Sequence, residues 1–150
     1  MPEIKRLTEY TPEVAEAVRG LLVELSRSGK DRGEIPKEWF LEVIDSPYHD
    51  LILATNGDAI LGMAVVSVTM GAIVRKNVYL EDFVVTERAR GQGVGGLIWD
   101  EILRWGQEKG AGELEFTSGE GREAAWQFYL NKGAEIYKTN FFKKELHDRN

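Results

Sequence analysis

A glycine-rich turn between a predicted strand and a predicted helix constrains this chain more than any other feature. The turn follows an apolar run at residues 78–85 and reads Arg90-Gly91-Gln92-Gly93-Val94-Gly95-Gly96. A helical pattern of apolar residues begins at Val94. Such a turn directs several backbone N–H groups at one point, and glycine lets an anion approach the main chain. The turn therefore predicts a phosphate-binding site, with Arg90 placed to pair with phosphate oxygens.

Three other interpretations of the turn compete with this one. Gly91, Gly93 and Gly96 satisfy the dinucleotide-binding pattern G-x-G-x-x-G, and Glu113 follows about 20 residues later, where that fold has an acid. The context argues against NAD, because the turn follows a hairpin pattern instead of the first strand of a βαβ array. The phosphate loop of nucleoside triphosphatases would need a Lys-Ser/Thr pair after the glycines. The plain structural alternative is a flexible glycine turn.

The composition excludes several classes of protein. The chain has 150 residues, 43% of them hydrophobic, which fits one domain with a substantial core. It has no cysteine, and its two histidines, His49 and His147, lie far apart, so no metal site is expected. A net charge of −6 disfavours nucleic-acid binding. Without a long apolar run or a signal-peptide pattern, we expect no membrane association and a cytoplasmic protein.

The periodicity of the apolar residues predicts alternating blocks of helix and strand. Thr11 and Pro12 mark the start of the first helix, Asn56-Gly57 marks a hairpin, and Gly133 marks the end of the last helix. The predicted strands cover residues 4–7, 51–54, 59–68, 78–85, 114–117, 134–138 and 141–146. The predicted helices cover residues 12–27, 36–44, 94–109 and 120–131. This order indicates an α/β fold in which a hairpin precedes the glycine-rich turn.

Two motifs together resemble the GNAT acetyltransferase superfamily. Arg90-x-x-Gly93-x-Gly95 after the strand end Val84-Val85 resembles the acyl-CoA loop of that family. Phe128-Tyr129-x-x-x-Gly133, about 35 residues later, resembles its aromatic helix end. The order and the elements between the motifs also agree, and the resemblance covers residues 51–146. The segment Tyr79-Leu80-Glu81-Asp82-Phe83 looks most like the small-amine branch, which includes polyamine acetyltransferases.

The resemblance implies a single N-acetyltransferase domain over residues 1–150. Residues 1–50 would form the variable substrate-side region, and residues 51–146 the CoA-binding and catalytic core. The implied architecture is a mixed, mostly antiparallel sheet of about seven strands flanked by about four helices. Two parallel strands, 78–85 and 114–117, would splay apart in the middle of that sheet. The gap would hold the pantetheine arm of acetyl-CoA.

The resemblance also implies roles for individual residues. The main chain of Phe83, Val84 and Val85 would bind the pantetheine arm, and a backbone N–H near Val84 or Val85 would polarise the thioester carbonyl. Glu81 would be the base that takes a proton from the amine, and Tyr129 the acid that protonates the thiolate. Because adjacent strand residues face opposite layers, only one of Glu81 and Asp82 should face the acceptor, and Asp82 is the alternative base. The cofactor-binding residues are Phe83, Val84, Val85, Arg90, Gly91, Gln92, Gly93, Val94, Gly95, Gly96 and Arg122.

Some features leave the substrate open. Arg122 stands where many relatives carry Asn, which makes its contact with the pantetheine arm uncertain, and Ala134 replaces a common Phe. We expect transfer of an acetyl group from acetyl-CoA to a primary amine of a small molecule, in a homodimer like those of many relatives. The alternatives are a protein or peptide N-acetyltransferase, or a non-catalytic CoA-binding module on the same fold.

Overall fold

The computed structural model describes residues 1–147, which divide into two compact units, Met1–Phe116 and a second unit that begins at Thr117. The second unit contains α4 (Glu123–Asn131). The first unit contains, in chain order, β1 (Glu3–Arg6), α1 (Pro12–Leu25), α2 (Lys37–Asp45), β2 (His49–Asn56), β3 (Ala59–Thr69), β4 (Asn77–Val85), the 3-10 helix η1 (Glu87–Ala89), α3 (Val94–Glu108) and β5 (Glu113–Glu115).

The five strands form one sheet in the order β1-β2-β3-β4-β5. The first four are antiparallel to their neighbours, and β5 is parallel to β4. The mostly antiparallel sheet and the four helices confirm the predicted α/β class. The turn at Asn56-Gly57 joins β2 to β3 as predicted, and Gly57 has a positive φ of 62°. Only glycine and a few polar residues adopt that conformation readily.

The two strands predicted at residues 134–138 and 141–146 are absent from the described part of the chain. Residues 134–147 form neither helix nor strand, and their large apolar side chains, such as Ile136 and Phe142, are exposed. Aromatic and β-branched residues gave these segments a high strand propensity. A strand also needs a neighbour for its backbone hydrogen bonds and a surface on which to pack, which propensity does not supply. The predicted count of about seven strands is therefore wrong, and the structure has five.

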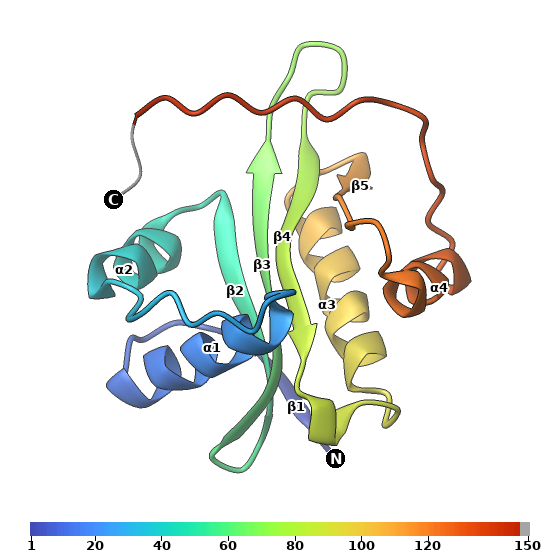
Figure 1. Ribbon diagram of the computed structural model, residues 1–150. Helices are drawn as coiled ribbons and strands as arrows, with labels where there is room; N and C mark the ends of the chain where they lie inside the picture. Colours follow the sequence, from blue (N-terminus) through green and yellow to red (C-terminus); the bar gives the residue numbers. More distant parts are fainter. Residues whose placement is uncertain (148–150) are drawn as a thin grey trace. The chain divides into compact units, whose positions relative to one another are not determined.

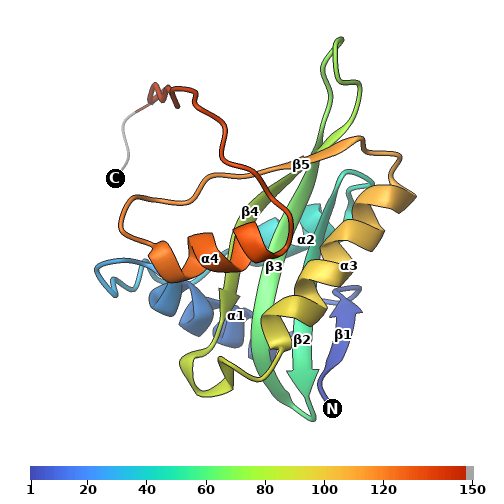
Figure 2. The same ribbon diagram turned by 90° about the vertical axis from the view of Figure 1, so that its right-hand side faces the viewer.

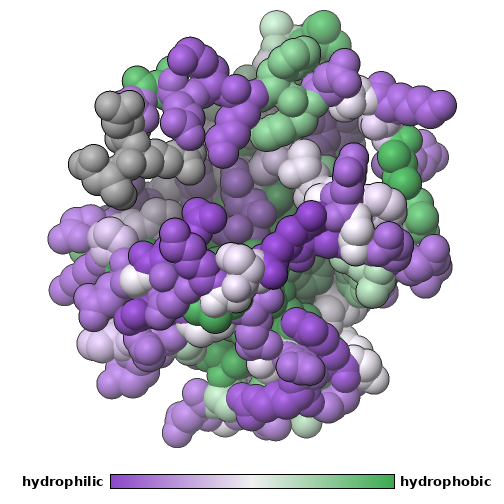
Figure 3. Space-filling model, viewed as in Figure 1, coloured by the Kyte–Doolittle hydropathy of each residue, from purple (hydrophilic) through white to green (hydrophobic). Residues whose placement is uncertain are grey.

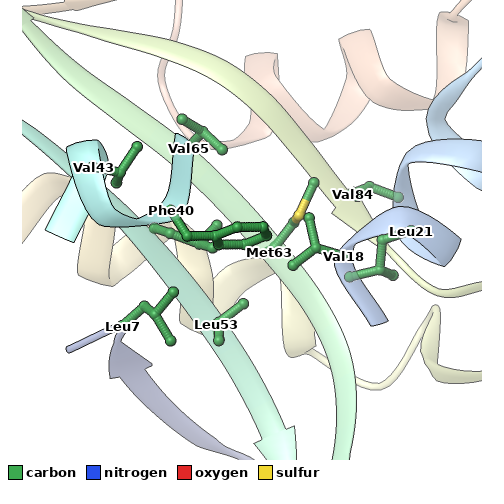
Figure 4. Packing of buried hydrophobic residues seen from close by; sticks show 10 residues of the cluster. Leu7, Val18, Leu21, Phe40, Val43, Leu53, Met63, Val65 and Val84 are labelled. Carbon is green, nitrogen blue, oxygen red and sulfur yellow. The ribbon is translucent and has the colours of Figure 1, made fainter. Parts of the chain in front are cut away.

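Helices cover both faces of the sheet in the first unit. Figures 1 and 2 show α1 and α2 against one face and α3 against the other. The core on the first face places the fully buried Phe40 of α2 among Val18, Leu53 and Met63, as Figure 4 shows. The outward surfaces of α1 and α2 carry mostly hydrophilic side chains (Figure 3). These helices are amphipathic, as the spacing of their apolar residues predicted.

Helix α3 approaches the sheet closely because glycines lie at the contact. A Cβ on Gly62 of β3 would come within 2.9 Å of the Val84 carbonyl oxygen and 3.0 Å of Ile98 in α3. A Cβ on Gly106 of α3 would come within 2.9 Å of Val78. Trp105 is fully buried beside this contact and its indole donates to Asp50 at 3.1 Å. This close packing fixes α3, and therefore its first turn, against β3 and β4.

The ends of two helices follow the predicted signals. The Thr11 hydroxyl accepts a hydrogen bond from the Val14 N–H at 3.1 Å, and Pro12 occupies the first position of α1. At the end of α4, Gly133 has a φ of 91°, and the Ala134 N–H donates to the Tyr129 carbonyl. This pairing is the Schellman motif, which requires a left-handed residue such as glycine. Within residues 1–147, no helix has the length and apolar character needed to cross a membrane.

Candidate active site

A bulge interrupts β4 at the two acidic residues of the predicted site. Val65 of β3 lies opposite Asp82, but the next residue, Val66, lies opposite Leu80. Glu81 is therefore an extra residue in β4 with no partner of its own on β3. A bulge of this kind locally resets the alternation of side chains between the two faces of a sheet.

The bulge places both carboxylates on the same face of the sheet. Tyr79 lies opposite Ser67, and Asp82 lies opposite Val65. Ser67 and Val65 are two residues apart on β3, so they share a face, which is the one that α1 and α2 cover. Asp82 joins them there, and Glu81, two residues after Tyr79, keeps the same face. The prediction that Glu81 and Asp82 face opposite layers is wrong, because it assumed an unbroken alternation.

Both carboxylates have a raised pKa, and burial is the main cause in each case. Burial raises the pKa of Glu81, the negative charge of Asp82 raises it further, and His49 acts in the opposite direction. Burial alone raises the pKa of Asp82. Within residues 1–147 neither carboxylate has a hydrogen-bond donor or an ion-pair partner. Such a pair can bind an ammonium group and accept a proton from it.

The edge of β4 that faces away from β3 is only partly covered by β5. The parallel pairing joins Asn77 to Glu113 and ends where Tyr79 meets Glu115. Strand β4 then continues to Val85, whereas β5 has ended. The predicted second strand, 114–117, is therefore one residue earlier at its start and two residues shorter at its end. This arrangement leaves residues 80–85 of β4 beyond the last pair with β5.

The backbone directions along this edge distinguish the three residues predicted to bind the pantetheine arm. The Thr86 N–H donates to Leu61 of β3, and the Val84 carbonyl also lies on the β3 side, next to Gly62. Since backbone groups alternate in direction along a strand, those of Phe83 and Val85 point away from β3. The main-chain N–H and C=O groups of Phe83 and Val85 thus point toward the edge of β4 that β5 does not cover, whereas those of Val84 point toward β3.

The glycine-rich turn has the open geometry that the sequence predicted. Gly91 and Gly93 have positive φ values of 76° and 83°, and a Cβ on either would meet no atom within 4 Å. Gly93 is the N-cap of α3 and supplies no side-chain cap. The first turn of α3 comprises Val94, Gly95 and Gly96, and the Leu97 N–H makes the first backbone bond, to Gly93. The preceding N–H groups are the donors that a helix start leaves for a ligand.

Arg90 and Gln92 bind the protein's own backbone in this structure. The Arg90 Nε donates to the Val85 carbonyl at 3.0 Å, and one of its terminal nitrogens lies 4.0 Å from a Glu24 oxygen. The Gln92 amide donates to the Arg88 carbonyl at 3.0 Å. These contacts hold the turn to the end of β4. The Arg90 side chain is 56% exposed and its guanidinium has further donors, so it can also reach an anion.

Tyr129 and Arg122 belong to the second unit, where α4 positions them. Arg122 is the residue just before α4, and Tyr129 lies in its last turn. Burial raises the pKa of the Tyr129 phenol, and the positive charge of Arg122 opposes that shift. A raised pKa keeps the phenol protonated at neutral pH, which is the form that can donate a proton. Helix α4 begins at Glu123, three residues later than predicted.

Sequence reasoning missed the bulge and two polar residues that lie beside it in the register, His49 and Ser67. His49 was considered only as a metal ligand, and among residues 1–147 no cluster of metal-ligating side chains occurs. The available signal was the polar character of His49, Ser67 and Tyr79 within otherwise apolar strands. Their adjacency depends on strand register, which the sequence does not specify directly.

Known proteins share the fold of this chain and identify its family. The profile of the acetyltransferase (GNAT) family matches residues 15–133. Among solved structures, a transcriptional regulator from Bacillus halodurans C-125 is similar with a TM-score of 0.82 and 22% identity, over 97% of this chain and 100% of that one. An aminoglycoside acetyltransferase from an uncultured soil metagenomic sample, in complex with trehalose, has a TM-score of 0.81 and 20% identity, over 96% of each chain.

A third structure, AAC(6')-Iy in complex with a bisubstrate analog, has a TM-score of 0.75 and 20% identity, over 97% of this chain and 99% of that one. At these identities the structural likeness shows a shared fold. No curated protein sequence matched the chain. The family profile covers well over half of the chain and includes both the glycine-rich turn and the helix that carries Tyr129. The chain therefore belongs to the acetyltransferase (GNAT) family.

Proposed function

We propose that the protein transfers an acetyl group from acetyl-CoA to the primary amine of a small molecule. The observation that carries this proposal is the pair Glu81 and Asp82, two carboxylates on one face of β4 that have no cationic partner in the described part of the chain. The same strand leads into the glycine-rich turn at residues 90–96. A group that can take a proton and a turn that can hold a phosphate are therefore joined by one short stretch of chain.

The residues present fit acetyl-CoA as the donor. The N–H groups at the start of α3 would hold its pyrophosphate, since Gly91 and Gly93 leave open space over that turn. Gln92 and Val94 to Gly96 complete the turn, and Arg90 would add charge-assisted hydrogen bonds. The outward main chain of Phe83 and Val85 would bind the amide-rich pantetheine arm as an added strand would.

Glu81 is the proposed base. An alkyl ammonium group has a pKa of about 10.4 in water, so the acceptor arrives protonated and must lose a proton before its nitrogen can attack. Glu81 takes that proton and passes it to solvent, and the neutral nitrogen then forms a bond to the acetyl carbon as the carbon–sulfur bond breaks. The nitrogen loses its second proton as the amide forms, which balances the proton that the thiolate takes up. Burial raises the pKa of Glu81 toward that of the amine, and the smaller difference between the two pKa values makes the proton transfer more favourable. Asp82 is the alternative base.

Tyr129 is the proposed acid, which would return a proton to the departing thiolate. A tyrosine phenol carries its proton at neutral pH because its usual pKa is about 10, and burial raises the pKa of this half-buried one further. The backbone N–H of Phe83 or Val85, which points away from β3, would polarise the carbonyl of the thioester. The family resemblance also assigns a role in CoA binding to Arg122, which lies just before the same helix as Tyr129. The role of each residue follows from the family resemblance together with its local geometry.

A small-molecule acceptor is supported by two observations. The segment Tyr79-Leu80-Glu81-Asp82-Phe83 resembles that of small-amine acetyltransferases. Three of the similar structures are aminoglycoside acetyltransferases by name, including one in complex with sisomicin. Paired carboxylates also suit a compact cation, because they can surround an ammonium group with acceptors.

Ligand-induced stabilisation tests the donor, and thiol release tests the reaction. Acetyl-CoA and CoA at about 100 times their Kd should raise the Tm by about 5 °C or more, whereas NAD and ATP should leave it unchanged. Release of free thiol from acetyl-CoA should then depend on an added primary amine. Stabilisation by NAD in place of CoA would contradict the assignment of the turn. Binding of CoA without thiol release against any amine or peptide would identify a non-catalytic module.

A further inference from the structure

Three polar residues form a row across the middle of the sheet, on the face that carries Glu81 and Asp82. His49 of β2 lies opposite Ser67 of β3, and Ser67 lies opposite Tyr79 of β4. The next residues of β2 and β3 on this face, Leu51 and Val65, belong to the apolar core, and the two carboxylates follow Tyr79 on β4. Since neighbouring strands are about 4.8 Å apart, the row spans roughly 10 Å.

Ser67 is the unusual member of this row. Its side chain and backbone are only 7% exposed, and its hydroxyl has no hydrogen-bond partner among residues 1–147. The hydroxyl oxygen is not completely enclosed, since Asn77 Oδ1 is the one fully enclosed side-chain atom without a partner in that part of the chain. Buried polar groups are almost always hydrogen-bonded. A hydroxyl in this state, in register with His49 and Tyr79, is available to bond to a ligand.

His49 is held in place at one end of the row. Its Nδ1 lies 2.8 Å from the Ser46 hydroxyl, and that same oxygen accepts a bond from the Tyr48 N–H at 3.1 Å. The imidazole therefore has one nitrogen committed to the protein and its Nε2 left for another partner. The effect of His49 on the pKa of Glu81 agrees with their position on the same face.

We propose that His49, Ser67 and Tyr79 determine acceptor specificity by binding hydroxyl groups, so that the acceptor is a hydroxylated primary amine. The proposal rests on the function proposed above. The two carboxylates bind the reacting ammonium group, whereas the row offers a hydroxyl, a phenol and an imidazole. The Ser67 hydroxyl and the Tyr79 phenol can each donate and accept a hydrogen bond, and the His49 Nε2 donates or accepts according to its tautomer, so the row can bind hydroxyl groups. A second ammonium group would be served better by a carboxylate than by this row, which contains none.

Two primary amines on six-membered rings test the proposal. Glucosamine carries its amine on a hydroxylated six-membered ring, and cyclohexylamine carries the same group on a ring without hydroxyls. The wild-type enzyme should prefer glucosamine in kcat/KM. In Ser67→Ala the ratio of the two kcat/KM values should fall by about fivefold to twentyfold, through the KM for glucosamine. His49→Ala, at an exposed position where little packing is lost, should lower the same ratio.

Thr55→Val is the matched control. Thr55 is another buried polar residue of the sheet, 6% exposed, and lies outside the row near the β2–β3 hairpin. Its substitution should leave the ratio unchanged. Equal loss for both amines in Ser67→Ala, or an unchanged ratio in both row variants, would overturn the proposal. A wild-type preference for cyclohexylamine or for the diamine putrescine would overturn it as well.

Direct binding separates failure of this inference from failure of the proposed function. Saturation-transfer NMR with glucosamine and CoA present requires no turnover and reports which ring protons contact the protein. If Ser67→Ala weakens the contacts between glucosamine and the protein, the proposed role of the row is supported even when no amine is acetylated. The absence of acetylation would then count against the proposed function alone. Acetylation of amines with no loss of glucosamine contacts in Ser67→Ala would count against the row alone.

Discussion

Glu81 and Asp82 are neighbours in the sequence, yet their side chains lie on the same face of β4. The bulge that leaves Glu81 without a partner on β3 produces this arrangement. An unbroken strand would send the two carboxylates to opposite layers. The bulge therefore brings two negative charges together, which raises the pKa of Glu81 beyond the effect of burial. This irregularity therefore adds the repulsion of Asp82 to the larger effect of burial on the pKa of Glu81.

Replacing Glu81 with Gln should lower kcat/KM by about 100-fold or more, because the proton of the amine loses its acceptor. In the wild-type enzyme the rate should rise with pH as Glu81 ionises, through a pKa above the usual value of about 4.3. Glu81→Gln should lose this limb of the pH–rate profile. Steady-state kinetics over the acidic to mildly alkaline range check the prediction.

Asp82→Asn tests the coupling between the two carboxylates. Removing the charge of Asp82 removes one cause of the raised pKa of Glu81, so the limb of the profile should move to lower pH. The maximal rate should change by less than about tenfold. Loss of the limb in Asp82→Asn and its retention in Glu81→Gln would instead identify Asp82 as the base.

Asp82→Asn should also change the dependence of stability on pH. Burial raises the pKa of Asp82 in the folded state, so the folded protein keeps this proton to a higher pH than the unfolded chain. Its ionisation therefore destabilises the fold as the pH rises from about 3.9 through the raised pKa. Asp82→Asn should raise the Tm at about pH 7 by roughly 2 °C and should have no effect near about pH 3. Asp100→Asn, at an exposed position on α3, is the control; an equal gain there would contradict this account.

Tyr129→Phe should keep the fold and lose most of kcat. The substitution removes only the hydroxyl, so the packing of the ring in α4 is retained, but the proton donor for the thiolate is lost. We expect kcat to fall by about tenfold or more with little change in the KM for acetyl-CoA. Tyr137→Phe, at a site 78% exposed, should leave kcat unchanged. Full activity of Tyr129→Phe would remove Tyr129 from the mechanism.

Gly93→Ala should weaken both the fold and the binding of acetyl-CoA. Gly93 has a φ of 83°, and an alanine in that conformation costs roughly 1–2 kcal/mol. Gly20→Ala is a matched control, since Gly20 lies within α1, has no positive φ, and has no atom within 4 Å of the place that an alanine methyl would occupy. That variant should gain roughly 0.5–1 kcal/mol from helix propensity. Thermal unfolding with and without acetyl-CoA checks both variants. If Gly93→Ala bound acetyl-CoA as tightly as the wild type does, the role of the turn would be contradicted.

The elements that the sequence predicted are those set by local chemistry. Thr11 and Pro12 mark the start of α1, Asn56-Gly57 turns the hairpin, and Gly133 ends α4. In each case a short motif satisfies backbone groups within a few residues of itself. The turn at residues 90–96 was predictable for the same reason, because its backbone adopts positive φ values at Gly91 and Gly93, where glycine is favoured whatever the rest of the fold.

The features that the sequence did not predict depend on residues distant along the chain. The bulge at Glu81 is a property of the register between β3 and β4, and no residue within β4 specifies it alone. The strands expected at residues 134–146 had the propensity but no neighbouring strand in the described structure. The row of His49, Ser67 and Tyr79 likewise joins three strands whose adjacency only the folded sheet reveals.

The most direct test of the central claim is the mass-spectrometric detection of an acetylated amine, quantified against the free thiol released from acetyl-CoA. The wild-type enzyme should form one acetylated amine per thiol, and Glu81→Gln should form both at least about 100-fold more slowly at neutral pH. Thiol release at the same rate in wild type and Glu81→Gln, with no acetylated amine, would contradict the account.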